Sequence, residues 1–191
     1  MNSLRVISGS ARGFHLRSVP GDTTRPITDR VKEALFNILG RDVEGSTFLD
    51  VFGGTGAVGI EALSRGAAYA RFLEINRQAV ETIHANLQHT HLAEKADVFR
   101  IDAFSYLKQK PDRPFDYIFV APPQYKELWL KTMAVLGENP GWLAPGGLLI
   151  VQVDPVEYRQ QEFPQFELIE QRRYGSTLIL FYEAAAMEGP I

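Results

Sequence analysis

Short apolar runs and amphipathic stretches alternate through most of this chain. The apolar runs have the length of strands and are rich in β-branched and aromatic residues, whereas the stretches between them repeat their apolar residues at helical spacing. The pattern predicts strands at 47–52, 71–75, 96–101, 116–120 and 147–153, with helices at 57–64, 77–89, 103–108 and 125–136. Because strands and helices alternate, these strands should form a parallel sheet.

The last two apolar runs break this alternation. Residues 166–173 and 177–183 are strand-like, and only Tyr174-Gly175-Ser176 separates them. No crossover helix fits in three residues, so the two strands should pair as an antiparallel hairpin. A mostly parallel, Rossmann-like α/β sheet of seven strands closed by such a hairpin is the layout of class I methyltransferases. A dinucleotide-binding domain would instead continue with a helix and a parallel strand.

The start of the chain has a pattern of its own. Two short strands at 4–8 and 15–19 predict a small hairpin, followed by a turn-rich connector at 20–26. Thr28 is a suitable cap for a helix that begins at Asp29 and ends at Gly40. We therefore expect a small hairpin and helix ahead of the alternating region.

Positive charge is concentrated in this first segment. Residues 1–41 contain seven basic and three acidic side chains, a net charge of +4, while the whole chain carries −3 and the remainder therefore −7. The segment is either a solvated basic surface or a local nucleic-acid footprint. We predict an N-terminal extension at 1–41, a class I methyltransferase domain at 42–185 and a tail at 186–191.

Composition limits the remaining possibilities. The chain has 191 residues, enough for one well-packed domain, and it contains no cysteine, so disulfides and thiolate metal sites are excluded. It has no apolar stretch long enough to span a bilayer and no secretory signal pattern. We expect a cytoplasmic protein without a membrane partner.

The glycine-rich loop from Asp50 to Gly59 is the strongest candidate site. Its three glycines at 54, 56 and 59 satisfy G-x-G-x-x-G, which alone would suggest NAD and a dehydrogenase. However, Asp50 would place a carboxylate beside the pyrophosphate that such a loop cradles, and the two like charges repel. S-adenosylmethionine has no phosphate and carries an ammonium and a sulfonium, so an acid at Asp50 suits this cofactor. The alternative is that the glycines serve only tight packing.

Two more acids follow later strands. Glu74 stands where a carboxylate accepts the ribose hydroxyls of an adenosine cofactor, and Asp102 could accept from the adenine amino group. Either acid could instead cap the helix that follows it. The residues predicted to bind S-adenosylmethionine are Asp50, Phe52, Gly53, Gly54, Thr55, Gly56, Glu74, Ile75, Asp102 and Ala103.

The loop after the fourth strand of the alternating region is the candidate acceptor site. It reads Ala121-Pro122-Pro123-Gln124-Tyr125. Adjacent prolines stiffen a loop, and a stiff loop ending in an aromatic residue suits a base that has left its stack, with Tyr125 stacking on it. The alternative is a proline-terminated strand before a helix.

The chain as a whole resembles the RsmD family, bacterial methyltransferases that modify the N2 amine of a guanine in small-subunit ribosomal RNA. The resemblance runs from near Arg5 to Tyr182 and includes the segments Arg5 to Gly9 with Gly13, Arg25 to Leu39, Asp50 to Gly59 and Tyr174 to Thr177. It implies S-adenosylmethionine as cofactor and 16S ribosomal RNA as partner, within an assembly particle. We also expect a monomeric enzyme that needs no metal. The resemblance also implies that basic residues near the N-terminus contact RNA phosphates: Arg5, Arg12, Arg25 and Arg30. Arg30 could equally be a charge on the helix surface.

One position departs from the family pattern. Relatives that methylate amino groups usually carry Asp or Asn before Pro-Pro-Tyr, whereas this chain has Ala121, with Gln124 inserted before Tyr125. The carbonyl of Ala121 or Pro122, or the Gln124 amide, could accept from the target amine instead. The alternatives are a catalytically weak or inactive RNA-binding protein of the same fold and a methyltransferase with another nucleic-acid acceptor.

Two other groups of residues do not support a site. His84, His89 and His91 suggest a metal by spacing, but nothing places the last two on one face, so we predict no metal site. Trp129 and Trp142 are predicted to be core residues rather than base stackers.

Overall fold

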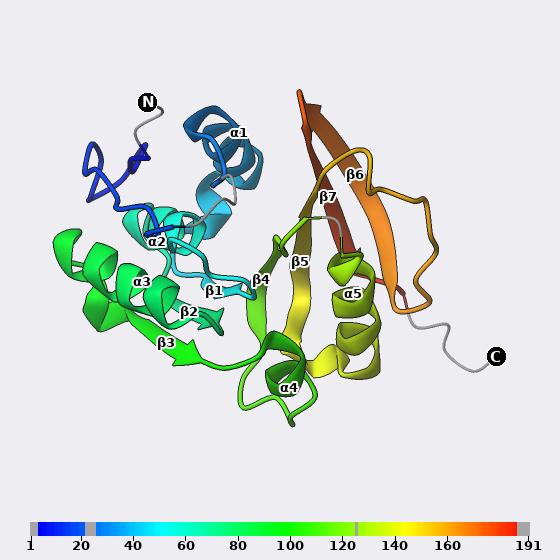
Figure 1. The fold of residues 1–191 in the computed structure, drawn as a ribbon. Helices are drawn as coiled ribbons and strands as arrows, with labels where there is room; N and C mark the ends of the chain where they lie inside the picture. Colours follow the sequence, from blue (N-terminus) through cyan, green and yellow to red (C-terminus); the bar gives the residue numbers. More distant parts are fainter. Residues whose placement is uncertain (1–3, 22–25, 125, 187–191) are drawn as a thin grey trace. The chain divides into compact units, whose positions relative to one another are not determined.

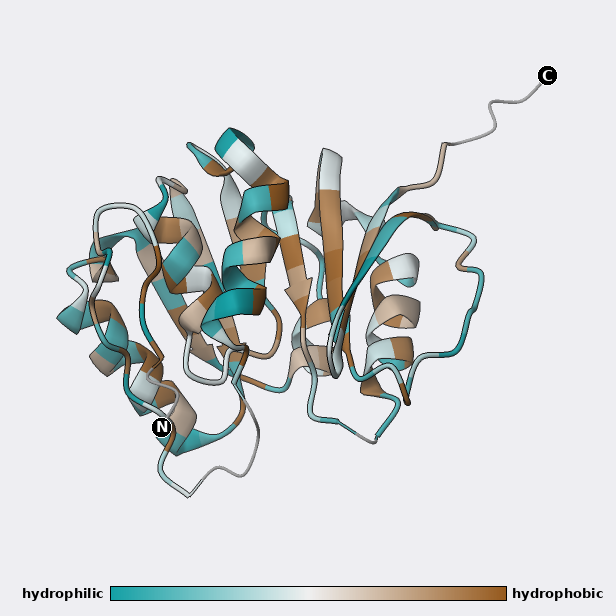
Figure 2. Ribbon diagram, turned by 90° about the horizontal axis from the view of Figure 1, so that it is seen from above, coloured by the Kyte–Doolittle hydropathy of each residue, from teal (hydrophilic) through white to brown (hydrophobic). Residues whose placement is uncertain are grey.

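The computed structural model describes residues 4–21, 26–124 and 126–186, and the chain divides into two compact units. Unit 1 is Met1–Tyr106 and unit 2 is Leu107–Ile191. In the helices, hydrophobic and hydrophilic residues alternate along the ribbon, as expected of helices with one apolar and one polar face (Figure 2).

Unit 1 contains a parallel three-stranded sheet with helices (Figure 1). The sheet order is β3, β2, β1. The elements are α1 (Asp29–Leu39), η1 (Gly40–Val43), β1 (Thr47–Asp50), α2 (Ala57–Ser64), β2 (Tyr69–Glu74), α3 (Arg77–His89), η2 (Ala93–Lys95), β3 (Ala96–Arg100) and α4 (Ala103–Leu107), which ends one residue into unit 2. Helices α2 and α3 pack on the sheet.

Local capping explains where the helices of unit 1 begin. The Thr28 side chain accepts a hydrogen bond from the Val31 amide at 3.3 Å, and the Asn76 side chain accepts from the Ala79 amide at 3.1 Å. Helix α1 ends where Gly40 takes a φ of +61°. The predicted bounds of α1, α2 and α3 are confirmed.

The N-terminal hairpin is looser than predicted. The backbones of Leu4 and Val6 bond those of Leu16 and Phe14, but only the single antiparallel bridge between Arg5 and His15 forms. The predicted strands at 4–8 and 15–19 are therefore wrong in extent. The reason is that the backbone leaves the hairpin after Val6 and turns toward α2, where side chains accept its next amide hydrogens.

Unit 2 contains parallel and antiparallel pairs (Figure 1). Its elements are β4 (Phe115–Val120), α5 (Leu128–Glu138), η3 (Pro140–Trp142), β5 (Leu143–Val153), β6 (Phe166–Tyr174) and β7 (Thr177–Ala184). Strand β4 pairs with β5 in parallel, and β7 lies antiparallel between β5 and β6. The predicted terminal hairpin is confirmed.

Two predicted bounds in unit 2 are wrong. Helix α5 begins at Leu128 rather than at residue 125, because Glu127 takes a left-handed φ of +50° that interrupts the helix. Strand β5 begins four residues earlier than expected. Its register with β4 shifts between Leu143 and Leu148, a stretch of β5 that includes two glycines. Trp129 and Trp142 are both buried, as predicted.

Candidate functional site

The glycine-rich loop joins β1 to α2 inside unit 1. The Gly53 amide donates to the Leu73 carbonyl of β2 at 2.8 Å, and Gly54 and Gly56 take φ angles of +56° and +80° that side-chain-bearing residues rarely adopt. A Cβ on Gly53 would lie 2.8 Å from Ile83 Cδ1 of α3. The loop therefore needs glycine for two reasons: its backbone takes left-handed φ angles, and it passes close to α3.

Gly59 has a different role. It lies within α2, and a Cβ there would fall 2.4 Å from the ring of Phe72 on β2. This glycine permits close packing of α2 on the sheet. At this position, the alternative that the glycines serve tight packing is therefore the correct one.

Asp50, the last residue of β1, is buried at 2% exposure. The backbone amides of Phe52 and Gly59 donate to its carboxylate, yet its Oδ1 atom is buried without a partner. Burial raises the pKa of Asp50 well above its ordinary value of 3.8, and the nearby Glu74 carboxylate raises it further. An unpaired buried oxygen of this kind is costly unless a cation or donor meets it.

Glu74, the last residue of β2, holds the loop in place. Its Oε2 accepts from the Gly54 amide and its Oε1 from the Asn76 amide, both at 2.9 Å. Each carboxylate oxygen retains a free lone pair, so the half-buried side chain can still accept two hydroxyl groups. Beside it, Ile75 is an apolar side chain left 62% exposed.

These features fit the ends of S-adenosylmethionine. The unpaired Oδ1 of Asp50 suits an ammonium, the free lone pairs of Glu74 suit ribose hydroxyls, and exposed Ile75 offers an apolar surface to an adenine ring. The carboxylate of Asp102 is engaged as a helix cap, since Oδ2 accepts from both the amide and the hydroxyl of Ser105 at 2.8 and 2.9 Å.

The remaining predicted cofactor residues surround these groups. Ala103 is buried, and the Phe52 ring meets the Phe104 ring edge-on at 6.2 Å between centroids. The Thr55 hydroxyl accepts from the Ala57 amide at 3.3 Å. Unit 1 thus brings together every residue predicted to bind the donor, and their roles toward it stay predictions.

The candidate acceptor loop follows β4 in unit 2. Ala121 and Pro122 are half-buried, while Pro123 and Gln124 are exposed. Tyr125 lies outside the described residues.

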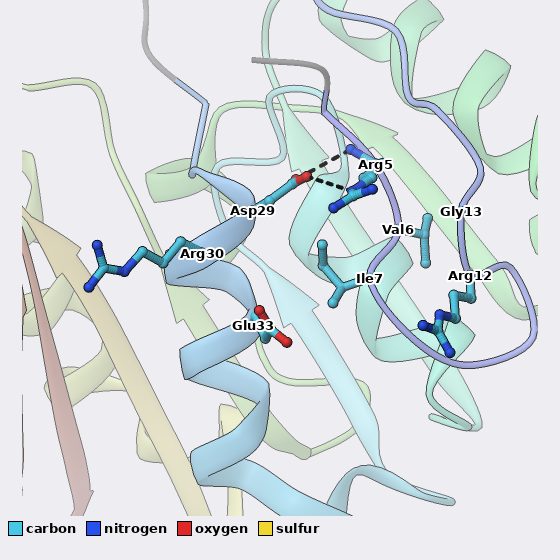
Figure 3. Close-up of a pocket in the computed structure, with 8 residues that line it drawn as sticks. All are labelled: Arg5, Val6, Ile7, Arg12, Gly13, Asp29, Arg30 and Glu33. Atoms are coloured by element: carbon cyan, nitrogen blue, oxygen red, sulfur yellow. Dashed lines mark hydrogen bonds and ion pairs between the residues drawn. The ribbon is translucent and has the colours of Figure 1, made fainter.

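Three of the four arginines predicted to bind RNA line one hollow of about 460 Å³ in unit 1 (Figure 3). Arg5 donates from Nε to Asp29 Oδ2 at 3.2 Å, so its charge is already partly balanced. Arg12 projects from the turn of the hairpin, whereas Arg30 extends from α1 away from the other two (Figure 3). Arg25 lies outside the described residues.

Buried polar side chains fasten the N-terminal segment to the rest of unit 1, and the sequence reasoning missed them. Glu61, in α2, is fully buried and accepts from the Ile7 and Ser8 amides at 2.9 and 3.1 Å. Lys32, in α1, is fully buried 3.6 Å from Glu61 and donates to the Arg5 carbonyl at 2.5 Å. Burial lowers the pKa of Lys32, and the charge of Glu61 opposes this.

A signal for these residues was present in the sequence. A charged residue within an apolar helix, as in Ala57-Val58-Gly59-Ile60-Glu61-Ala62-Leu63, indicates a carboxylate that needs internal partners. Lys32 likewise falls on the apolar face of α1 next to Val31 and Leu35.

The described part of the chain has neither a cluster of metal-ligating side chains nor a helix that could span a membrane. It holds no group of three or more His, Asp or Glu side chains that could bind a metal. His89 and His91 instead meet the Phe14 ring edge-on. Within the same ranges, no helix is long and apolar enough to cross a membrane.

Comparison with known structures identifies the class. The Escherichia coli protein yhhF is 35% identical, with a TM-score of 0.84 over 95% of this chain and 98% of that one. An RNA methyltransferase from Salinibacter ruber, solved in complex with S-adenosyl-L-homocysteine, has a TM-score of 0.65 at 15% identity over 87% of this chain and 97% of that one. The fold is that of the class I S-adenosylmethionine-dependent methyltransferases.

Sequence comparison identifies the family. The model of the family described as conserved hypothetical protein 95 matches residues 4–183. The ribosomal RNA small subunit methyltransferase D of Escherichia coli (strain K12) is 40% identical over 149 residues, 78% of this chain and 74% of that protein. The chain belongs to this family, the RsmD family, and the resemblance seen in the sequence is confirmed.

Proposed function

We propose that this protein transfers a methyl group from S-adenosylmethionine to the exocyclic N2 amine of a guanine in small-subunit ribosomal RNA. The observation that carries the proposal is the buried Asp50 carboxylate, whose Oδ1 has no partner at the end of β1 beside a glycine loop. The family relatives named small subunit methyltransferase D supply the RNA substrate class.

The donor contributes an electrophilic methyl group on a sulfonium. Asp50 accepts from the ammonium of its methionine end, and the positive charge relieves the cost of the buried carboxylate. Glu74 accepts from the ribose hydroxyls with the lone pairs that the Gly54 and Asn76 amides leave free. The left-handed glycines let the backbone follow the donor closely. Asp102 and Ala103 lie at the edge of the donor site, next to the adenine end of S-adenosylmethionine.

The acceptor loop aligns the nucleophile. Two prolines restrict the backbone next to Ala121, so the carbonyls of Ala121 and Pro122 point in fixed directions and can accept from the amine. The amine nitrogen would bond to the methyl carbon as the sulfur–methyl bond breaks, which gives S-adenosylhomocysteine and a proton that passes to solvent or to a nearby carbonyl. This displacement needs alignment and a compensating dipole more than a strong base. Gln124 is exposed and offers a further amide, and Tyr125 is proposed to stack on the base.

The basic N-terminal segment is proposed to contact RNA phosphates. Arg5, Arg12 and Arg30 all border the hollow of unit 1, and Arg25 precedes α1 in the sequence. Phosphate contacts of this kind position an RNA without reading its sequence. Replacing Arg12 with Ala should therefore weaken RNA binding most at low salt.

Mapping methyl groups tests the proposal. The protein is incubated with labelled S-adenosylmethionine and either naked 16S transcript or small-subunit assembly particles, and the labelled nucleotide is located. We expect N2-methylguanine at a single site. Label on another nucleotide or on another atom would contradict the proposed acceptor, and the Asp50→Asn variant, at a limiting donor concentration, serves as the control with weakened donor binding.

One observation favours a second candidate, a protein of the same fold with weak or no turnover. Ala121 lacks the side-chain oxygen that amino-methylating relatives carry before the prolines. Single-turnover transfer distinguishes the two functions. Measurable wild-type transfer, raised roughly tenfold or more in Ala121→Asn, supports a working enzyme that lacks one acceptor. Transfer only in Ala121→Asn would support the inactive alternative.

A further inference from the structure

Asn86 is a buried amide that contacts two functionally different segments of unit 1. It lies in α3 and has 0% exposure, among the otherwise mostly apolar inward residues Ala79, Ile83 and Leu87. A buried amide in such a position is unfavourable unless its polar atoms are bonded. The partners of Asn86 therefore show why an amide stands there.

The first partner is the N-terminal segment. Asn86 Oδ1 accepts from the Arg17 amide at 2.8 Å, and Asn86 Nδ2 donates to the Arg17 carbonyl at 3.1 Å. The side chain thus binds both backbone groups of one residue, as a neighbouring strand would. Glu61 and Ser64 of α2 accept from backbone amides at the turn of the hairpin. The contact between Asn86 and Arg17 lies at the opposite end of the hairpin.

The second partner is the donor loop. Asn86 Nδ2 also donates to the Thr55 carbonyl at 2.9 Å. Thr55 stands between Gly54, whose amide is held by Glu74, and Gly56, which opens α2. The two hydrogens of one amide nitrogen therefore join the donor loop to the N-terminal segment.

We propose that Asn86 is a positioning residue that couples the donor loop to the N-terminal segment, so that donor binding orders residues 15–17. Three hydrogen bonds restrict the amide to one orientation, and a shift of the Thr55 carbonyl must move the atoms that hold Arg17. Coupling of this kind is reciprocal, so a ligand that holds the N-terminal segment also favours the donor. The inference rests on the proposed donor site in unit 1.

Hydrogen exchange of the Arg17 amide tests the coupling, since that amide donates directly to Asn86. Exchange is measured with and without saturating S-adenosylhomocysteine. In the wild type we expect the ligand to slow exchange at Arg17 at least about fivefold. In Asn86→Ala, at a ligand concentration that still saturates the site, the slowing should be lost.

Thr82→Val is the matched control. Thr82 is buried on the same helix, and its hydroxyl donates only within α3, to the Gln78 carbonyl at 2.8 Å. This variant should keep the ligand-dependent slowing. If Asn86→Ala does not fold, Asn86→Ser replaces it, and the absence of slowing in the wild type would by itself overturn the inference.

Two results would overturn the inference. One is a wild type that binds S-adenosylhomocysteine without any slowing at Arg17, and the other is an equal slowing in the wild type and in Asn86→Ala. A wild type that does not bind S-adenosylhomocysteine at all would instead contradict the proposed function, which separates the two failures.

Discussion

The two units differ in what they bury. Among the described residues, nine buried polar or charged side chains lie in unit 1 and only Thr132 lies in unit 2. The nine are Lys32, Ser46, Asp50, Glu61, Ser64, Arg71, Thr82, Asn86 and Thr90. Buried polar groups destabilise a fold unless they are bonded, so their concentration in one unit calls for a reason.

The partners of four of the nine, Lys32, Glu61, Ser64 and Asn86, supply a reason. Glu61, Ser64 and Asn86 bond backbone that lies more than fifty residues away in the sequence, in the N-terminal segment. Thr132, like Thr82 and Thr90 of unit 1, donates only to a carbonyl of its own helix, that of Leu128 at 2.7 Å. The interior of unit 1 holds irregular backbone in place for a site, whereas the interior of unit 2 is mainly apolar packing between regular elements.

The largest expected effect comes from Glu61→Ala. The change leaves the Lys32 ammonium buried without its carboxylate and two amides of the N-terminal segment without an acceptor. We expect a loss of about 3–5 kcal/mol in the free energy of unfolding, measured by denaturant titration. The matched change in unit 2, Thr132→Val, should cost about 1 kcal/mol or less.

If Glu61→Ala and Thr132→Val lowered the free energy of unfolding equally, the proposed difference between the polar interior of unit 1 and the apolar interior of unit 2 would be contradicted. Near-UV circular dichroism of Glu61→Ala checks that the loss comes from a folded variant rather than from a chain that never folds.

A pair of helical glycines gives the next largest effect. In Gly59→Ala of α2, the new methyl would lie 2.4 Å from the buried Phe72 ring, and overpacking of this kind costs about 1–3 kcal/mol. In Gly137→Ala of α5, the methyl meets only the flexible end of the Gln165 side chain, so helix propensity should make the change neutral or stabilising by up to about 1 kcal/mol. Thermal unfolding measures both, and destabilisation of Gly137→Ala by as much as Gly59→Ala would contradict this difference.

At a pH above the raised pKa of Asp50, Asp50→Asn should stabilise the unliganded protein by about 1–2 kcal/mol, because it removes a buried charged carboxylate with an unpaired oxygen. The pKa of Asp50 is raised in the folded protein, so the fold binds this proton more tightly than the unfolded chain does. Wild-type stability should therefore fall as the pH rises from about 4 through the raised pKa, and Asp50→Asn should lack this fall. Unfolding titrations of both proteins across this pH range measure it, and parallel pH profiles would show that Asp50 does not titrate as described.

The smallest expected effect on stability is that of Ala121→Asn in unit 2. The position is half-buried in a loop, so the free energy of unfolding should change by no more than about 0.5 kcal/mol, while methyl transfer rises. Thermal unfolding and single-turnover transfer are measured on the same preparation. A large loss of stability would show that this loop is held as tightly as the polar interior of unit 1.

The comparison also explains what the sequence could predict. Helix α1 could be located to the residue because its cap, Thr28, acts locally. The bounds of α3 followed from the apolar pattern alone, and the structure adds its cap, Asn76. The extent of the N-terminal hairpin could not be predicted, since Glu61 and Ser64, distant in sequence, take over its hydrogen bonds. Nor did periodicity show the left-handed Glu127 that delays α5.

The residues of the candidate site likewise divide into those that the sequence predicts and those that it does not. Asp50, Glu74 and the glycines follow directly from strand ends and loop chemistry, and unit 1 brings them together. The cap on Asp102 was foreseen only as an alternative, and the structure shows it. Asn86 was not foreseen, because its role depends on two segments that are separated from it by 31 and 69 residues.

Calorimetric titration with S-adenosylhomocysteine and with NAD tests the central claim most directly, namely that the polar interior of unit 1 is built to hold a methyl donor. We expect the wild type to bind S-adenosylhomocysteine and not NAD, and Asp50→Asn, folded and more stable, to bind it at least about tenfold more weakly. Binding of NAD, or unchanged affinity for S-adenosylhomocysteine in Asp50→Asn, would contradict the claim.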